Sequence, residues 1–143
     1  MNEATTQTRT AKSARSAGNR FRFGLAAAAV VVGIVYTLIA VHAIRVAEMT
    51  GDMAGKEFPY LVMAAAAAAF WLGAVLLVLF DKRLVYLLGA AVQVVVLIGY
   101  FAIASMRDPH YEGWGVTMKA VEVVMLAMLL YRAAKFSSPR AAC

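Results

Sequence analysis

Four long apolar stretches dominate the sequence, and each is close to the length that crosses a bilayer. They cover residues 23–44, 58–80, 84–106 and 114–134. A helix needs about 20 apolar residues to cross about 30 Å of hydrocarbon. Because lipid offers no hydrogen bonds to the backbone, a run of this length crosses the membrane as a helix. The sequence therefore predicts an all-α integral membrane protein, in which four transmembrane helices form an antiparallel bundle.

The composition agrees with a membrane protein that has no additional soluble domain. Hydrophobic residues make up 63% of the chain and charged residues 15%, whereas soluble domains contain about 45–50% and about 25%. The apolar run that starts at residue 23 is longer than the roughly 7–15 residues of a signal-peptide core, so we expect a retained span. The predicted organisation is a disordered basic cytoplasmic tail at 1–22, a transmembrane domain at 23–134 and a short basic tail at 135–143.

The distribution of basic residues predicts the orientation in the cell membrane. Basic residues concentrate in the cytoplasmic segments of membrane proteins, so we expect both termini in the cytoplasm. The same asymmetry accounts for the sequence pI of about 9.8, and we therefore expect contact with the lipid bilayer and no nucleic-acid partner. Ten of the 14 Lys and Arg residues lie on the predicted inner side: Arg9, Lys12, Arg15, Arg20, Arg22, Lys82, Arg83, Arg132, Lys135 and Arg140.

Small residues predict how two of the spans pack. The second span carries six consecutive alanines at 64–69 and then Gly73, while the third carries Gly89 and Gly99. Membrane helices associate through close packing of small residues. The short connection at 81–83 makes these spans antiparallel neighbours, so we expect their small faces to meet with closely spaced backbones.

Charge inside the fourth span is the most informative feature for function. Lys119 and Glu122 both lie in this span, and Glu122 lies about 12 Å from Trp114 along the helix, at about 1.5 Å per residue. An ionisable group in a membrane is costly and usually has a partner or a function. Lys119 is three residues before Glu122 and can pair with it along the helix surface, while its ammonium extends toward the membrane surface.

The predicted topology brings further polar residues to the level of Glu122. His42 lies near the outer end of the first span, and its contact with Glu122 has three open interpretations: a functional pair, a structural bond, or no contact. A cluster at one depth predicts an outward-facing polar pocket that holds a ligand or a proton. Its candidate residues are His42, Glu122, Lys119, Tyr60 and Tyr100.

Other polar residues give weaker indications. Gln93, in the middle of the third span, predicts a hydrogen bond between helices. The methionine and histidine spacing is too sparse to predict a copper site, and haem would need His42 to face His110. The single cysteine, Cys143, has no partner for an internal disulfide. No catalytic spacing is present, so we predict no catalytic residue, metal or cofactor.

Three classes of function remain open. Small size, the absence of motifs and an alanine-rich surface favour a non-enzymatic accessory or assembly subunit of a larger membrane complex, or a homo-oligomer. A small proton-linked transporter or ligand-binding protein would use Glu122 as its functional group. A membrane redox or lipid-modifying enzyme is the third alternative.

Overall fold

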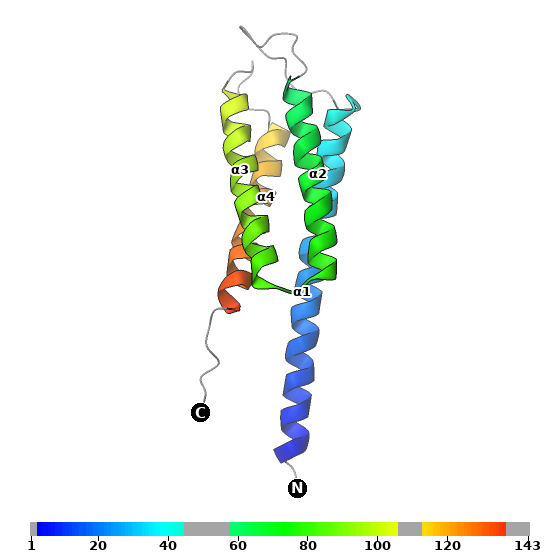
Figure 1. The fold of residues 1–143 in the computed structure, drawn as a ribbon, viewed down its shortest axis with the longest axis vertical. Helices are drawn as coiled ribbons and strands as arrows, with labels where there is room; N and C mark the ends of the chain where they lie inside the picture. Colours follow the sequence, from blue (N-terminus) through cyan, green and yellow to red (C-terminus); the bar gives the residue numbers. More distant parts are fainter. Residues whose placement is uncertain (1–2, 45–57, 106–112, 137–143) are drawn as a thin grey trace.

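The structure, a computed structural model, describes residues 3–44, 58–105 and 113–136. Within these ranges the chain is all-α, as the sequence predicts. Figure 1 shows the second half of α1 lying alongside the other helices, while its first half projects beyond the bundle. The helices are α1 Glu3–Ala40, α2 Phe58–Leu79, α3 Arg83–Ala104 and α4 Gly113–Lys135.

Three segments are long and apolar enough to cross a membrane. They are Gly18–Ala40 in α1, Tyr60–Leu79 in α2 and Arg83–Ala104 in α3. The fourth helix has 23 residues and carries Lys119 and Glu122 in addition to its apolar residues. The chain is therefore a multi-span helical protein of the kind predicted for residues 23–134.

The helices form a ring in which each contacts two others. α1 packs against α2 and α4, and α3 packs against α2 and α4, with the closest contact between α1 and α2. The buried positions alternate at spacings of three and four residues, a pattern typical of helices that cross at a small angle. In α1 these positions are Leu25, Ala29, Val32, Tyr36 and Ile39, and in α2 they are Met63, Ala67, Phe70, Ala74 and Leu77.

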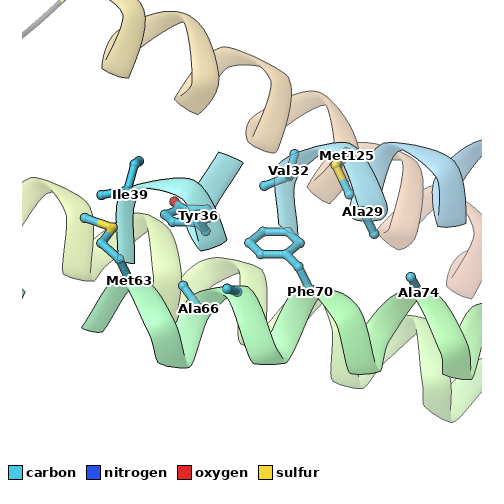
Figure 2. Close-up of a cluster of buried hydrophobic side chains, with 10 residues drawn as sticks. Ala29, Val32, Tyr36, Ile39, Met63, Ala66, Phe70, Ala74 and Met125 are labelled. Atoms are coloured by element: carbon cyan, nitrogen blue, oxygen red, sulfur yellow. The ribbon is translucent and has the colours of Figure 1, made fainter. Parts of the chain in front are cut away.

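The hydrophobic core has two clusters, one toward each end of the bundle. The cluster in Figure 2 joins α1 and α2, with Met125 added from α4. All four helices contribute to the other cluster, where Tyr86 of α3 is completely buried. α3 therefore belongs to the core at one end, where a short connection ties it to α2, but supplies no fully buried residue to the first cluster.

The small residues of α2 pack differently from the sequence prediction. Ala66 and Ala67 face α1, and Gly33 of α1 approaches the Phe70 Cβ so closely that an added Cβ would lie 3.4 Å from it. Gly73 and Gly99, which were expected to bring α2 and α3 together, have open space where a Cβ would be. The expected close α2–α3 contact is therefore wrong, because α1 offers a matching row of alanines and a glycine.

The amino-terminal segment also differs from its prediction. Residues 3–22, for which the sequence predicts a disordered tail, belong to α1. This segment contains Ala, Arg, Lys, Gln and Glu residues, which favour helix. The span that follows supplies the nucleus, so each further residue adds a hydrogen bond without a new nucleation cost.

Candidate functional site

The buried stripe of α4 contains two charged residues. Gly115, Lys119, Glu122, Met125 and Leu129 recur at spacings of three and four residues and are all buried. The same periodicity that turns apolar residues inward on α1 and α2 therefore turns Lys119 and Glu122 toward the bundle axis. Glu122 has an exposed fraction of 0% and Lys119 of 6%. The ammonium of Lys119 thus does not extend toward the membrane surface, as the sequence had suggested, but points inward.

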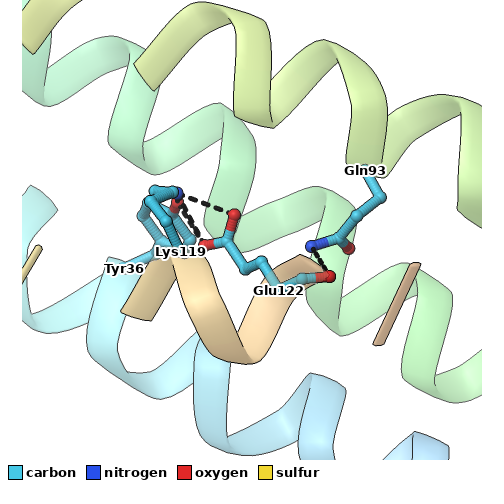
Figure 3. Close-up of polar contacts among 4 residues, drawn as sticks. All are labelled: Tyr36, Gln93, Lys119 and Glu122. Atoms are coloured by element: carbon cyan, nitrogen blue, oxygen red, sulfur yellow. Dashed lines mark hydrogen bonds and ion pairs between the residues drawn. The ribbon is translucent and has the colours of Figure 1, made fainter. Parts of the chain in front are cut away.

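These two side chains form a closed network with a tyrosine of α1 (Figure 3). The Lys119 Nζ donates to Glu122 Oε1 and Oε2, each at 2.7 Å, and also to the Tyr36 hydroxyl. The Tyr36 hydroxyl in turn donates to Glu122 Oε1 at 2.7 Å. An ammonium has three donors, and here all three are used. The pair is therefore fully satisfied by side chains of α1 and α4.

Aromatic rings hold the ammonium from two sides. The Lys119 Nζ lies 5.0 Å from the centre of the Tyr36 ring and 4.7 Å from that of Tyr100. A cation within about 6 Å of an aromatic face is stabilised by the ring quadrupole. Phe70 of α2 stacks on Tyr36, with ring centres 5.6 Å apart. A Cβ on Gly115 would lie 2.7 Å from the Tyr100 hydroxyl, so the absence of a side chain there makes room for Tyr100.

Gln93 connects α3 to the same part of α4. Its Nε2 donates to the main-chain carbonyl of Glu122 at 3.3 Å, and its exposed fraction is 3%. This is an inter-helix hydrogen bond, the kind of contact that an amide in the middle of a span predicts. Residues from α1, α3 and α4 thus meet around Glu122.

His42 does not join this network. The carboxylate of Glu122 is instead paired with Lys119 and Tyr36, and within the described ranges no hydrogen bond or ion pair links it to His42. The His42 ring contacts the Tyr60 ring, with centres 3.8 Å apart. The five candidate residues therefore divide into two groups. The exposed His42 contacts the half-buried Tyr60, and the buried Lys119 and Glu122 lie with the half-buried Tyr100.

The position of His42 has a backbone explanation. α1 ends at Ala40, and His42 has a φ of 61°, in the left-handed region. The amide of Ala43 donates to the carbonyl of Leu38 at 2.8 Å, and the amide of His42 donates to Ile39 at 3.0 Å. These two bonds define a Schellman motif, in which the left-handed residue ends the helix. His42 thus terminates the first span earlier than the predicted residue 44.

Tyr36 is the residue that the sequence prediction missed. It lies eight residues before the predicted end of the first span, and Glu122 lies eight residues after the predicted start of the fourth. Because the two spans are antiparallel, equal counts from the same membrane surface indicate equal depth. Counting from that surface would therefore have paired the Tyr36 hydroxyl with Glu122, whereas His42 is only two residues from the end of its span.

A second polar cluster lies at the opposite end of the bundle. Asp81, in the α2–α3 connection, accepts hydrogen bonds from the Tyr86 hydroxyl at 2.8 Å and from Arg132 Nη2 at 3.3 Å. The Arg132 guanidinium also lies against Gly18 of α1. The side chains of this ion pair are 19% and 34% exposed, and exposed pairs contribute only about 0–1 kcal/mol. The cluster connects the α2–α3 connection, α4 and α1 at this end of the bundle.

The network of Tyr36, Lys119 and Glu122 is a buried structural connection between α1 and α4. Removing one partner of a buried ion pair usually costs about 3–5 kcal/mol, so Lys119 and Glu122 hold each other in place. In the part of the chain that the structure describes, no group of three His, Cys, Asp or Glu residues could bind a metal ion. His110, the second histidine considered for haem, lies outside the described residues.

The chain can now be placed in a class. Its long apolar helices and buried polar network define a small multi-span helical membrane protein. Comparison of the sequence and the structure with protein families, curated proteins and solved structures gives no match. Its particular function must therefore be inferred from the molecule.

Proposed function

We propose that this protein is a non-enzymatic assembly subunit that packs against a larger complex in the cell membrane. The observation that carries the proposal is the low burial of α3. Only 17% of its apolar span is buried within the chain, compared with 39% for α1 and 33% for α2. α3 presents large apolar side chains, including Leu84, Val95 and Ile98, on its outer face. A partner in the membrane would cover this helix.

The burial of the Lys119–Glu122 pair supports the same function. A proton-linked transporter needs its acidic group to exchange protons with water. The Glu122 carboxylate is fully buried and already accepts hydrogen bonds from Lys119 and Tyr36. This arrangement favours a role in holding α1 and α4 together over a role in transport.

We also propose that α4 crosses the membrane and that both termini face the cytoplasm. In Figure 1, α4 lies alongside α3, and the end of α4, the start of α1 and the α2–α3 connection all lie toward the same end of the molecule. The inner-side basic residues of the sequence prediction belong to these segments and their tails. The positive-inside rule places such a surface in the cytoplasm.

Isolation from the native membrane tests the assembly function. The tagged chain, extracted in a mild detergent, should run on a native gel with another membrane protein in a fixed ratio, and deletion of its gene should lower the mass or amount of that complex. A chain that is recovered only as a monomer or homodimer, with all membrane complexes unchanged in the deletion strain, would show that the proposal is wrong.

A further inference from the structure

Basic side chains gather at the end of the bundle that contains the α2–α3 connection. In Figure 1 this connection and the end of α4 lie at the same end of the bundle, beside α1. Asp81 is the one acidic residue here whose side chain the structure describes, and it already accepts hydrogen bonds from Tyr86 and Arg132. An excess of one charge sign attracts a ligand of the opposite sign. We call this surface the basic end, and its residues are Arg20, Arg22, Lys82, Arg83, Arg132 and Lys135.

Two buried donors at the basic end have no hydrogen-bond acceptor. Within the described ranges, Arg22 Nε and Arg132 Nε are the buried side-chain nitrogen atoms that lack a partner. A buried donor on a charged group is costly when it is left unpaired. Both guanidinium groups therefore lack an acceptor that the described part of the chain does not supply.

Arg22 also lacks a counter-ion among the described residues. The ion pairs there are those of Lys119 and Arg132, and neither includes Arg22. The Arg22 side chain is half-buried, and its guanidinium carbon lies 5.1 Å from the centre of the Phe23 ring. A partly buried cation without an opposite charge is unfavourable. An anionic ligand would supply both the missing charge and the missing acceptor.

The two arginines are close enough to share one ligand. Arg132 Nη2 lies 3.1 Å from where a Cβ on Gly18 would be. Gly18 is four residues before Arg22, and residues four apart share a helix face, with Cβ atoms about 5–6 Å apart. Side chains of a helix lean toward its N-terminus, which turns Arg22 toward Gly18. The rings of their chain neighbours Phe21 and Tyr131 are 6.3 Å apart. The two guanidinium groups therefore lie about one turn apart, where α1 meets α4.

The level of the two arginines indicates a lipid phosphate. Arg22 directly precedes the first apolar stretch, and Arg132 lies in the last turn of α4. Lipid headgroups flank the hydrocarbon core at the ends of the spans. Phosphate oxygens accept two parallel hydrogen bonds from one guanidinium group. A zwitterionic headgroup also presents a cation, which the basic end repels, so an anionic phospholipid fits both the geometry and the charge.

We propose that Arg22 and Arg132 bind the phosphate group of one anionic phospholipid, at the junction of α1 and α4. The phosphate accepts hydrogen bonds from the guanidinium groups of both residues. The Phe23 ring over Arg22 is 48% exposed, and because exposed side chains change rotamer within nanoseconds, it can turn aside for the headgroup. The site requires that the basic end lies at a membrane surface, and it does not depend on the assembly function.

Native mass spectrometry of the purified full chain tests the ligand. The chain in a neutral detergent is titrated with phosphatidylglycerol, and with phosphatidylcholine as the zwitterionic control. We expect one phosphatidylglycerol molecule to bind more tightly than phosphatidylcholine by about fivefold or more, because each basic residue adds about 1 kcal/mol toward an anionic lipid. Equal affinities would overturn the proposal. Displacement of the lipid by an excess of inorganic phosphate would identify a free anion as the ligand and would also overturn it.

Arginine-to-lysine variants separate a specific site from general attraction to negative lipid. Arg22→Lys keeps the charge but loses the planar guanidinium group, and we expect phosphatidylglycerol to bind about tenfold more weakly. The matched control is Arg20→Lys, which changes an exposed arginine of the same helix and should leave the affinity unchanged. An unchanged affinity in Arg22→Lys, or an equal loss in Arg20→Lys, would refute the site.

Two further readouts keep these outcomes distinct. Circular dichroism establishes that each variant keeps the helix content of the wild type, and if Arg22→Lys does not fold, the comparison of the two lipids on the wild-type chain decides. A chain that co-purifies with a partner but does not prefer phosphatidylglycerol would remove only this lipid site. A chain that prefers phosphatidylglycerol but has no partner would remove only the assembly function.

Discussion

Replacing Lys119 with methionine removes the cation from the buried network and leaves Glu122 with only the hydroxyl of Tyr36. Glu122 has an exposed fraction of 0%, and its short side chain cannot reach the membrane surface from its position in α4. Breaking a buried ion pair from one side costs about 3–5 kcal/mol. We expect Lys119→Met to lower the free energy of unfolding by an amount in this range.

The reverse single replacement should cost less. In Glu122→Leu the ammonium of Lys119 loses both carboxylate bonds of 2.7 Å, but its long side chain can turn toward the near end of α4 and reach the headgroups. We therefore expect the lower end of the same range, about 3 kcal/mol. The double variant carries no buried charge and should lie within about 1 kcal/mol of the wild type, because apolar replacement of a whole buried pair is often neutral.

Equilibrium unfolding in mixed micelles measures these differences. The fraction of sodium dodecyl sulfate is raised, and helix content is followed by circular dichroism, with Tyr36→Phe as an additional variant. That variant removes a hydroxyl that both donates and accepts, and we expect it to cost about 1–3 kcal/mol. If the double variant loses as much stability as the two single variants combined, Lys119 and Glu122 do not stabilise each other and the network is wrong.

Three other predictions address single positions. His42→Val should be less stable than His42→Gly by about 1–2 kcal/mol, because φ is 61° at this position and a side chain with a branched Cβ is strained there; thermal unfolding in detergent measures the difference. Gly33→Leu should cost about 1–3 kcal/mol through overpacking against Phe70, whereas Gly73→Leu, which has open space, should leave the unfolding midpoint unchanged or higher. Cys143 in intact cells should resist a membrane-impermeant thiol reagent and react after permeabilisation; labelling without permeabilisation would contradict the cytoplasmic carboxyl terminus.

The sequence predicted the positions of the helices well, but it predicted poorly which face of each helix is buried. The apolar runs gave the positions of α2, α3 and α4 to within one or two residues, because the hydropathy of a span is a local property. The structure describes residues 3–22 as the first part of α1, whereas their low hydrophobicity predicted a disordered tail. Low hydrophobicity indicates that a segment has no apolar face to bury, and it leaves the helix preference of its residues open. The lysine and glutamate in α4 pair with each other, but the sequence prediction put His42 at the level of Glu122 and overlooked Tyr36, which the equal residue counts from the membrane surface would have indicated.

The sequence by itself determined that this chain forms long lipid-compatible helices and that charge enters the fourth one at Lys119 and Glu122. The tertiary structure decided which face of each helix is covered. α2 turns its small residues toward α1 and leaves Gly73 beside an open groove. The physical reason is that the length of an apolar span depends only on consecutive residues. Helix packing depends instead on how well the surfaces of two helices fit, and these helices can be far apart in the sequence. Each surface can also pack against more than one neighbouring helix.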